Sequence, residues 1–153
     1  MTPRYIVTAL FFTCGFASPV LAESLPENCV ILSESEGHNL VSQCSRAGPD
    51  GVTAFWTPSV AQVLDVEKRL PALLKTSGHK VHLADSGRQY IGVTSRGRRL
   101  IYINAFQESM AVALETNWRK KAFTICDGGD AFWGVAFDPN TGHFLYLGFN
   151  GIP

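Results

Sequence analysis

The chain has 153 residues, with 13 basic and 13 acidic side chains, so its formal net charge is zero. A near-neutral chain has no overall field that attracts nucleic acid or an anionic membrane, and neither is expected as a partner. The histidines are scattered and lack a cysteine or carboxylate at metal-ligand spacing, so no metal and no other cofactor is expected. The length fits a single domain with its own hydrophobic core.

Residues 1–22 have the composition of a cleavable export signal. Arg4 supplies a positive start, residues 6–16 are largely apolar, and Val20 and Ala22 are the small side chains that precede a cleavage site. The apolar run is too short to span the ~30 Å hydrocarbon core of a bilayer. A buried amino-terminal helix and a lipoprotein anchor are the two alternative interpretations of this segment.

Cleavage after Ala22 would leave 131 of the 153 residues, with no membrane-spanning run, in the periplasm or outside the cell. The cleaved chain keeps three cysteines, Cys29, Cys44 and Cys126. Because oxidising compartments favour disulfides, one bridge is expected, and the odd number leaves one thiol over. All three pairings are open at this point.

The first part of the cleaved chain, residues 23–55, has no clear periodicity and is expected to be irregular. A polar stretch at residues 33–39 separates short apolar pieces, which fits either two short strands or a short helix. Glycines and a proline within residues 47–51 break any regular element there. The folded domain is expected to occupy residues 56–153.

The next segment predicts one long helix. Thr57 can cap its amino end, and Pro58 is tolerated in the first turn because its missing N–H would have no partner there. Apolar residues then recur at helical spacing from Val60 onwards. Pro71 removes one hydrogen bond late in the helix, and Gly78 is a natural stop.

Beyond the helix the apolar period changes to two residues, which predicts antiparallel strands. The strands are expected at residues 89–94, at 100–104, at 122–126 continued or replaced by 132–137, and at 143–149, with a short helix within 106–118. The chain is therefore expected to be α+β, with one main helix packed on a curled antiparallel sheet of about four strands. This element order is similar to that of cystatin-like and nuclear-transport-factor-like folds, and the order alone implies nothing about activity.

The carboxyl-terminal tail carries the densest motif of the chain. It reads Cys-Asp-Gly-Gly-Asp at 126–130, Phe-Trp-Gly-Val at 132–135 and Asn-Gly at 150–151, and is preceded by distinctive segments at 56–58, 88–92 and 101–104. This pattern resembles a group of small exported bacterial proteins of uncharacterised function, over about residues 44–153. The resemblance implies an exported domain in which Cys44 and Cys126 form the disulfide. It implies no known reaction.

Cys126 is the candidate nucleophile of the tail, with His82 or His143 as its base. The adjacent carboxylates of Asp127 and Asp130 would raise the thiol pKa and disfavour the reactive thiolate. A disulfide cysteine that enters a bulged strand is therefore the preferred interpretation. The two aspartates could instead form the acid–base pair of a small hydrolase, but in a glycine loop they are more simply turn formers.

Two further patterns have simple structural explanations. Asp138, Asn140 and Gly142 resemble the start of a calcium loop, but residues 147–150 lack the closing carboxylate, and a hairpin turn uses the same residue types. The arginines within residues 96–99 could bind an anionic partner, but charged side chains at a hairpin tip also keep a sheet edge from pairing.

The aromatic residues are numerous for a chain of this size. Strand alternation sends Phe132 and Trp133 to opposite faces, and an aromatic face left exposed would bind a partner. We therefore expect an exported, non-enzymatic binding domain of the bacterial cell envelope, whose partner is a protein, such as an enzyme that it inhibits, or a small apolar ligand. A small hydrolase and a structural or stress-related envelope protein are the alternatives. The expected contact residues are Asp127, Gly128, Gly129, Asp130, Trp133 and Asn150.

Overall fold

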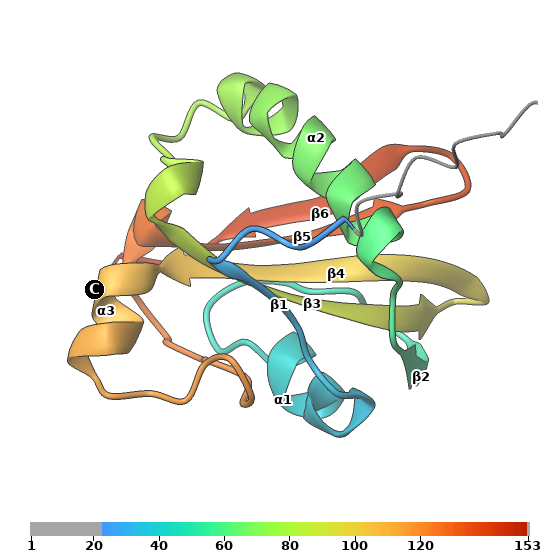
Figure 1. Ribbon diagram of the computed structural model, residues 1–153, viewed down its shortest axis with the longest axis horizontal. Helices are drawn as coiled ribbons and strands as arrows, with labels where there is room; N and C mark the ends of the chain where they lie inside the picture. The colour runs from blue at the N-terminus through green and yellow to red at the C-terminus, as the bar shows by residue number, and fades with distance from the viewer. Residues whose placement is uncertain (1–22, 153) are drawn as a thin grey trace, which may run out of the picture.

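The computed structural model describes residues 23–152, so the export signal expected at residues 1–22 lies outside the described residues. One mixed sheet of six strands forms the centre of the fold, with α2 on one face and α1 on the other (Figure 1). The strands are β1 (Cys29–Ile31), β2 (Val52–Trp56), β3 (Ser86–Ser95), β4 (Arg98–Gln107), β5 (Phe132–Asp138) and β6 (His143–Phe149). The α-helices are α1 (Gly37–Val41), α2 (Val60–Thr76) and α3 (Glu108–Ala113), and the 3-10 turns are η1 (Glu34–Glu36), η2 (Leu83–Asp85) and η3 (Gly129–Ala131).

The sheet order is β1-β3-β4-β5-β6, and β2 pairs with β3 beyond the end of β1. β1 runs parallel to β3, whereas the other neighbours are antiparallel. The α+β class is thus confirmed, but the expected arrangement of one main helix on about four antiparallel strands is corrected: residues 23–152 form three α-helices and a mixed sheet of six strands. Both additional strands come from residues 23–56, so that region belongs to the same sheet. Strands of three and five residues carry too little alternation to be recognised in a sequence.

The third strand expected at residues 122–126 is not formed, and β5 takes that place in the sheet. The backbone of the 122–126 segment is paired with side chains instead. The N–H of Ala122 donates to the Glu36 carboxylate at 2.9 Å, and the N–H of Phe123 donates to the Gln89 side chain at 3.0 Å. Because these N–H groups already have hydrogen-bond acceptors, they do not need the backbone partners that a strand would supply.

Helix α2 is the expected long helix, but it begins later than predicted. Ser59, not Thr57, is the N-cap, and it forms a capping box in which its hydroxyl accepts from the N–H of Gln62 while the Gln62 side chain accepts from the N–H of Ser59. The helix continues through Pro71 to Thr76. No helix within residues 23–152 is long and apolar enough to cross a bilayer.

Both faces of the sheet are covered. On one face α2 packs Val63, Val66 and Leu70 against Tyr90 and Trp133. The opposite face and the end near α3 carry two further apolar clusters, which include Leu40, Ile91, Tyr102, Phe106, Trp118 and Phe132. The exposed aromatic face considered from the sequence is therefore absent at β5, because helices and loops bury both sides of that strand.

Candidate functional site

The disulfide between Cys44 and Cys126 is confirmed, with a Cα–Cα distance of 5.0 Å. This bond removes Cys126 as a nucleophile. The remaining thiol, Cys29, is buried under α2, and burial raises its pKa to about 12 despite the opposing effect of Arg88. A protonated, buried thiol is a poor nucleophile, so neither cysteine site supports covalent chemistry.

Two of the expected contact residues are internal. Trp133 is fully buried in the core beneath α2, so its side chain cannot form part of an exposed surface. Asn150 is also buried: its side chain accepts a hydrogen bond from the Arg46 guanidinium at 2.6 Å and donates to the carbonyl groups of Ile125 and Asp127. The expectation that Trp133 and Asn150 form an exposed contact surface is therefore wrong, because both side chains are buried and contact other parts of the same chain.

Arg46 connects several segments of the tail motif. Its guanidinium donates to Asn150 and to Asn104 of β4, and Asn104 in turn donates to Gln89 of β3 and to the carbonyl of Phe123. This buried amide and guanidinium network, together with the disulfide, attaches the irregular segment after α3 to the sheet. The recurring polar residues of the motif thus have a structural explanation in this chain.

The two glycines of the motif form a tight turn that determines where the aspartates lie. Gly128 and Gly129 both have positive φ values, of 105° and 53°, and a side chain on Gly128 would meet the ring of Phe132 at 2.5 Å. The N–H of Gly129 donates to the carbonyl of Gly151 at 3.1 Å. Asp127 and Asp130, on either side of these glycines, are exposed.

The exposed side chain of Asp130 contacts the segment that follows α2. Its carboxylate lies 2.6 Å from Nδ1 of His79 and accepts from the N–H of Lys80 at 3.2 Å. The hydrogen bond from His79, followed by that from Lys80, lowers the pKa of Asp130. The His79 ring stacks on Phe149 with a centroid distance of 3.6 Å. These contacts place the segment after α2 beside the tail motif.

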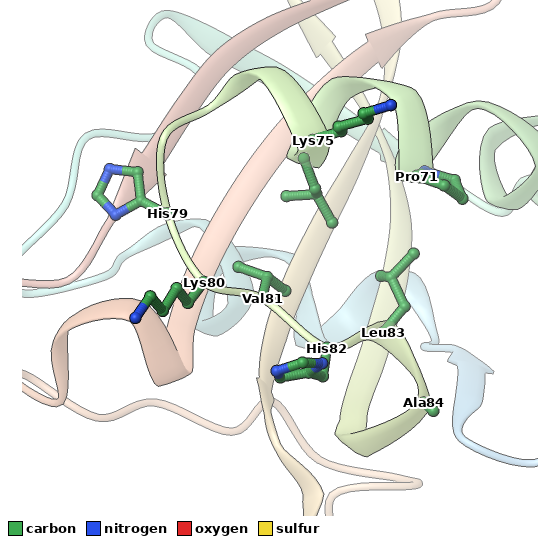
Figure 2. Close-up of a pocket in the computed structure, with 9 residues that line it drawn as sticks. Pro71, Lys75, His79, Lys80, Val81, His82, Leu83 and Ala84 are labelled. Atoms are coloured by element: carbon green, nitrogen blue, oxygen red, sulfur yellow. The ribbon is translucent and has the colours of Figure 1, made fainter.

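A groove of about 550 Å³ lies between the last turns of α2 and the chain that leads into η2 (Figure 2). Its apolar lining comes from Leu74, Val81 and Leu83 and from the ring of Pro71. Its polar lining is entirely basic and consists of Lys75, His79, Lys80 and His82. No carboxylate lines this groove, although Asp130 lies just beyond His79. The positive charges of Lys75 and Lys80 favour an anionic group beside an apolar one.

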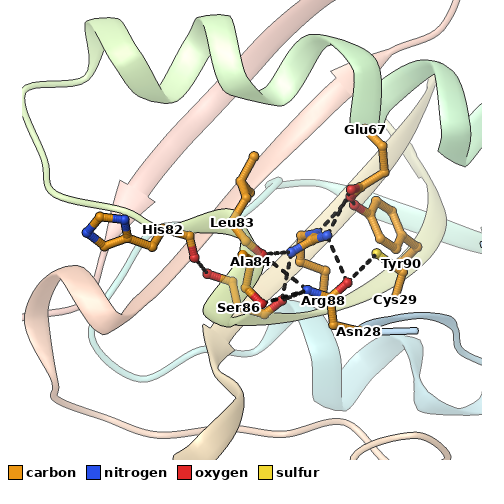
Figure 3. Close-up of polar contacts among 9 residues, drawn as sticks. All are labelled: Asn28, Cys29, Glu67, His82, Leu83, Ala84, Ser86, Arg88 and Tyr90. Carbon is orange, nitrogen blue, oxygen red and sulfur yellow. Dashed lines mark hydrogen bonds and ion pairs between the residues drawn. The ribbon is translucent and has the colours of Figure 1, made fainter. Parts of the chain in front are cut away.

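Buried polar contacts hold the η2 side of the groove in place (Figure 3). The Arg88 guanidinium donates to the carbonyl groups of Leu83 and Ser86 at 2.6 and 2.7 Å. The side-chain amide of Asn28 donates to the same two carbonyls, at 3.1 and 3.0 Å. The Ser86 hydroxyl bonds the carbonyl of His82 at 2.9 Å. The groove is therefore preformed, although one wall is not a regular element.

Two neighbouring hollows extend the groove. A hollow of about 190 Å³ shares Lys80 and His82 with the groove and adds Asp85 and Asp130. A hollow of about 580 Å³ beside α3 shares Asp85 with the second hollow and Ala84 with the groove. We call the surface formed by these three hollows the end surface, because it lies at the end of the molecule where α3 and the α2–β3 connection meet (Figure 1).

The end surface does not form a catalytic constellation. The ring of His79 is hydrogen-bonded to Asp130, but the described residues place no serine, threonine or cysteine side chain in hydrogen-bond contact with that ring. Residues 23–152 also contain no cluster of three or more side chains that could hold a metal ion. The arrangement can bind an anionic group and desolvate an apolar one.

No protein-family model, curated protein or solved structure matches the chain. Functional inference therefore rests on the geometry of the end surface. Sequence reasoning identified Asp130 but missed the groove residues Lys75 and Lys80. The available signal was the run His79-Lys80-Val81-His82, which places three side chains that can carry positive charge within four residues, directly after the long helix.

Proposed function

We propose that this chain is an exported, non-enzymatic binding domain whose groove takes an acidic and apolar segment of another protein. The observation that carries the proposal is the groove itself, which has an apolar floor, a wholly basic rim and a wall held by Arg88. A preformed groove avoids the entropy cost of ordering a loop during binding. Burial of apolar surface, at about 25 cal/mol per Å², would supply affinity, and the basic rim would select anionic partners.

The compartment supports a partner that is itself exported. The Cys44–Cys126 disulfide is compatible with an oxidising location, and residues 1–22 predict export to the periplasm or beyond. An inhibitor of an exported enzyme fits this proposal, because an inhibitor needs a preformed surface and no chemistry of its own. A purely apolar small ligand fits less well, because the basic rim would remain unpaired beside it.

The hydrolase alternative loses support on two points. Its proposed nucleophile, Cys126, is bonded to Cys44. Its proposed acid–base residue Asp130 accepts hydrogen bonds from His79 and Lys80, which keep it ionised through its lowered pKa. A solely structural envelope role leaves the preformed groove unexplained.

The proposal is tested with peptide probes and fluorescence anisotropy. A labelled peptide of alternating Glu and Leu is compared with Gln/Leu and Lys/Leu peptides of equal length. We expect the acidic peptide to bind the native protein, and the double variant Lys75→Glu/Lys80→Glu to weaken that binding at least tenfold, about 1.4 kcal/mol. The control is Lys68→Glu/Lys120→Glu, which makes the same charge change at exposed positions outside the groove. Equal binding of all three peptides, or equal loss in both variants, would contradict the proposed site.

A further inference from the structure

Helix α3 exposes apolar side chains beside the groove. Met110, Val112 and Leu114, in and directly after this helix, are 37%, 65% and 57% exposed. The buried side of the helix is held by Ala111, which packs with Phe106 and Trp118. Met110 and Leu114, four positions apart, lie on one side of the helix, whereas Val112 lies on another side and lines the hollow beside α3. Val112 is therefore the apolar side chain that this hollow offers to a partner.

The charges around α3 are opposite to those of the groove. The hollow beside α3 is lined by Asp85 and Glu108 together with Val112, and no basic side chain lines it, although Arg119 lies 3.5 Å from the Glu108 carboxylate at its edge. The groove is lined by basic side chains and no carboxylate. The chain therefore exposes, on its own surface, the acidic and apolar chemistry that the proposed function assigns to the groove's ligand.

The two surfaces are adjacent and lie at the same end of the molecule. The groove and the α3 hollow share Ala84, and the middle hollow, which contains His82 and Asp85, connects them. A two-fold axis through this middle part would place the groove of one copy on α3 of the other, and the reverse. Both contacts form together, as an isologous interface requires.

We propose that the end surface is a dimer interface, in which the basic groove of each copy receives the acidic, apolar α3 surface of its partner. The contact would bury Val112 and would pair Lys75 and Lys80 with the carboxylates of Asp85 and Glu108 across the axis. The cleaved chain has a net charge near −1, so two copies do not repel each other strongly. This inference rests on the ligand chemistry proposed for the groove, and a target of that chemistry would compete with the second copy.

Sedimentation velocity with charge-swap variants tests the dimer. The first variant is Lys75→Glu/Lys80→Glu, and the second is Asp85→Lys/Glu108→Lys. We expect the native protein to sediment as a dimer, each variant alone to sediment as a monomer, and an equimolar mixture of the two to restore a dimer. Restoration follows because each reversed groove then faces a reversed α3 surface. Raising the ionic strength to about 1 M, where the screening length is ~3 Å, should weaken the native dimer.

Controls separate loss of the dimer from loss of the fold. The Lys68→Glu/Lys120→Glu protein should remain dimeric, and all variants should retain the circular dichroism spectrum of the native protein at a temperature well below unfolding. The monomeric variants should unfold at a somewhat lower temperature, because they lack the stabilisation that dimer formation adds. Val112→Lys tests the same interface without changing the groove and should also give a monomer, because it places a positive charge opposite the lysines of the groove.

The proposal is overturned if the native protein is monomeric up to about 1 mM, where even a weak dimer would be populated. It is also overturned if the mixed variants stay monomeric. If the native protein is monomeric and still binds the Glu/Leu peptide, the dimer is contradicted and the proposed function is supported. If the mixture of the two charge-swap variants forms a dimer but the native protein does not bind the Glu/Leu peptide, the dimer interface is supported and the proposed function is contradicted.

Discussion

The Arg88 guanidinium of β3 donates to both carboxylate oxygens of Glu67 in α2, at 2.7 and 2.9 Å. The Arg88 side chain is 4% exposed and that of Glu67 is 13% exposed. Tyr90 adds a hydroxyl hydrogen bond to the same carboxylate, and burial, followed by the charge of Glu67, raises the pKa of that tyrosine. This buried pair joins α2 to the sheet, and the same guanidinium holds the η2 wall of the groove through the Leu83 and Ser86 carbonyls.

Replacing Arg88 with Met should destabilise the protein by about 3–5 kcal/mol, because Glu67 would be left as an uncompensated buried charge. The Glu67→Met/Arg88→Met double variant should cost less than Arg88→Met alone, because neither member of the pair is then left as an unpaired buried charge. Urea unfolding monitored by circular dichroism measures both values. Arg69→Met provides the control, since Arg69 pairs with Asp65 on the exposed side of α2 and should contribute at most about 1 kcal/mol. An equal cost for Arg88→Met and Arg69→Met would contradict the assigned role.

Removing the disulfide should lower the free energy of unfolding substantially, because the bond closes a long loop of the chain. The bond joins residues separated by 82 positions, so Cys44→Ser/Cys126→Ser should lower the free energy of unfolding by about 4 kcal/mol. Reduction of the native protein should give a similar loss. Cys29→Ala serves as the matched control, because its thiol forms no bridge.

The native protein should resist thiol reagents at neutral pH. The thiol of Cys29 is buried with a pKa of about 12, so alkylation should require unfolding. Intact mass after treatment with iodoacetamide measures this, and denaturant without reductant should expose one thiol in the chain cleaved after Ala22. Labelling of the native protein as fast as the denatured one would contradict the burial of Cys29.

Tyr102→Phe should leave the stability unchanged or raise it by up to about 1 kcal/mol. The Tyr102 hydroxyl is buried and has no hydrogen-bond partner within residues 23–152, so removing it removes a desolvation cost. Gly134→Ala should destabilise by about 1–3 kcal/mol, because the new Cβ would lie 2.6 Å from that hydroxyl and 2.8 Å from Nε of Arg46. Part of this loss should disappear in the Tyr102→Phe background. A thermal unfolding cycle of the four proteins measures the coupling, and strictly additive effects would disprove the contact.

Asp138 should contribute stability that disappears in acid. Its carboxylate accepts from the Arg98 guanidinium at 2.7 Å and from the N–H of Asn140 at 2.9 Å, and the Arg98 contact is the main cause of its lowered pKa. A lowered folded-state pKa stabilises the protein above the unfolded value of about 3.9, and this stabilisation is lost as the pH falls through the folded value. Asp138→Asn should therefore cost about 1 kcal/mol at pH 7 and progressively less below pH ~4.

Denaturant unfolding of native and Asp138→Asn proteins across this pH range measures the difference. Asp65→Asn provides a control on an exposed pair, with an expected cost below about 1 kcal/mol. A difference between native and Asp138→Asn proteins that stays constant from neutral pH to strong acid would show that the Arg98 contact does not set the pKa.

The long periodic elements could be predicted from the sequence, and the short ones could not. Helix α2 and the strands β3, β4 and β6 carry enough repeats to indicate their period. β1 has three residues and pairs in parallel with β3, which is far from it in the sequence, so no local pattern predicts this strand. Residues 122–126 looked like a strand because of their apolar alternation, but Gln89 and Glu36 satisfy the backbone there.

Local periodicity was enough to predict the α+β class, the long helix and the central hairpin. The Cys44–Cys126 pairing was implied by the resemblance of the tail motif and not by spacing. The burial of Trp133 and Asn150 and the contact of Asp130 with His79 appear only in the folded chain. Such contacts join residues far apart in the chain, and a side chain's burial depends on what other segments pack over it. The groove exists for the same reason: α2 and η2 form it only when Arg88 and Asn28 hold them on the sheet.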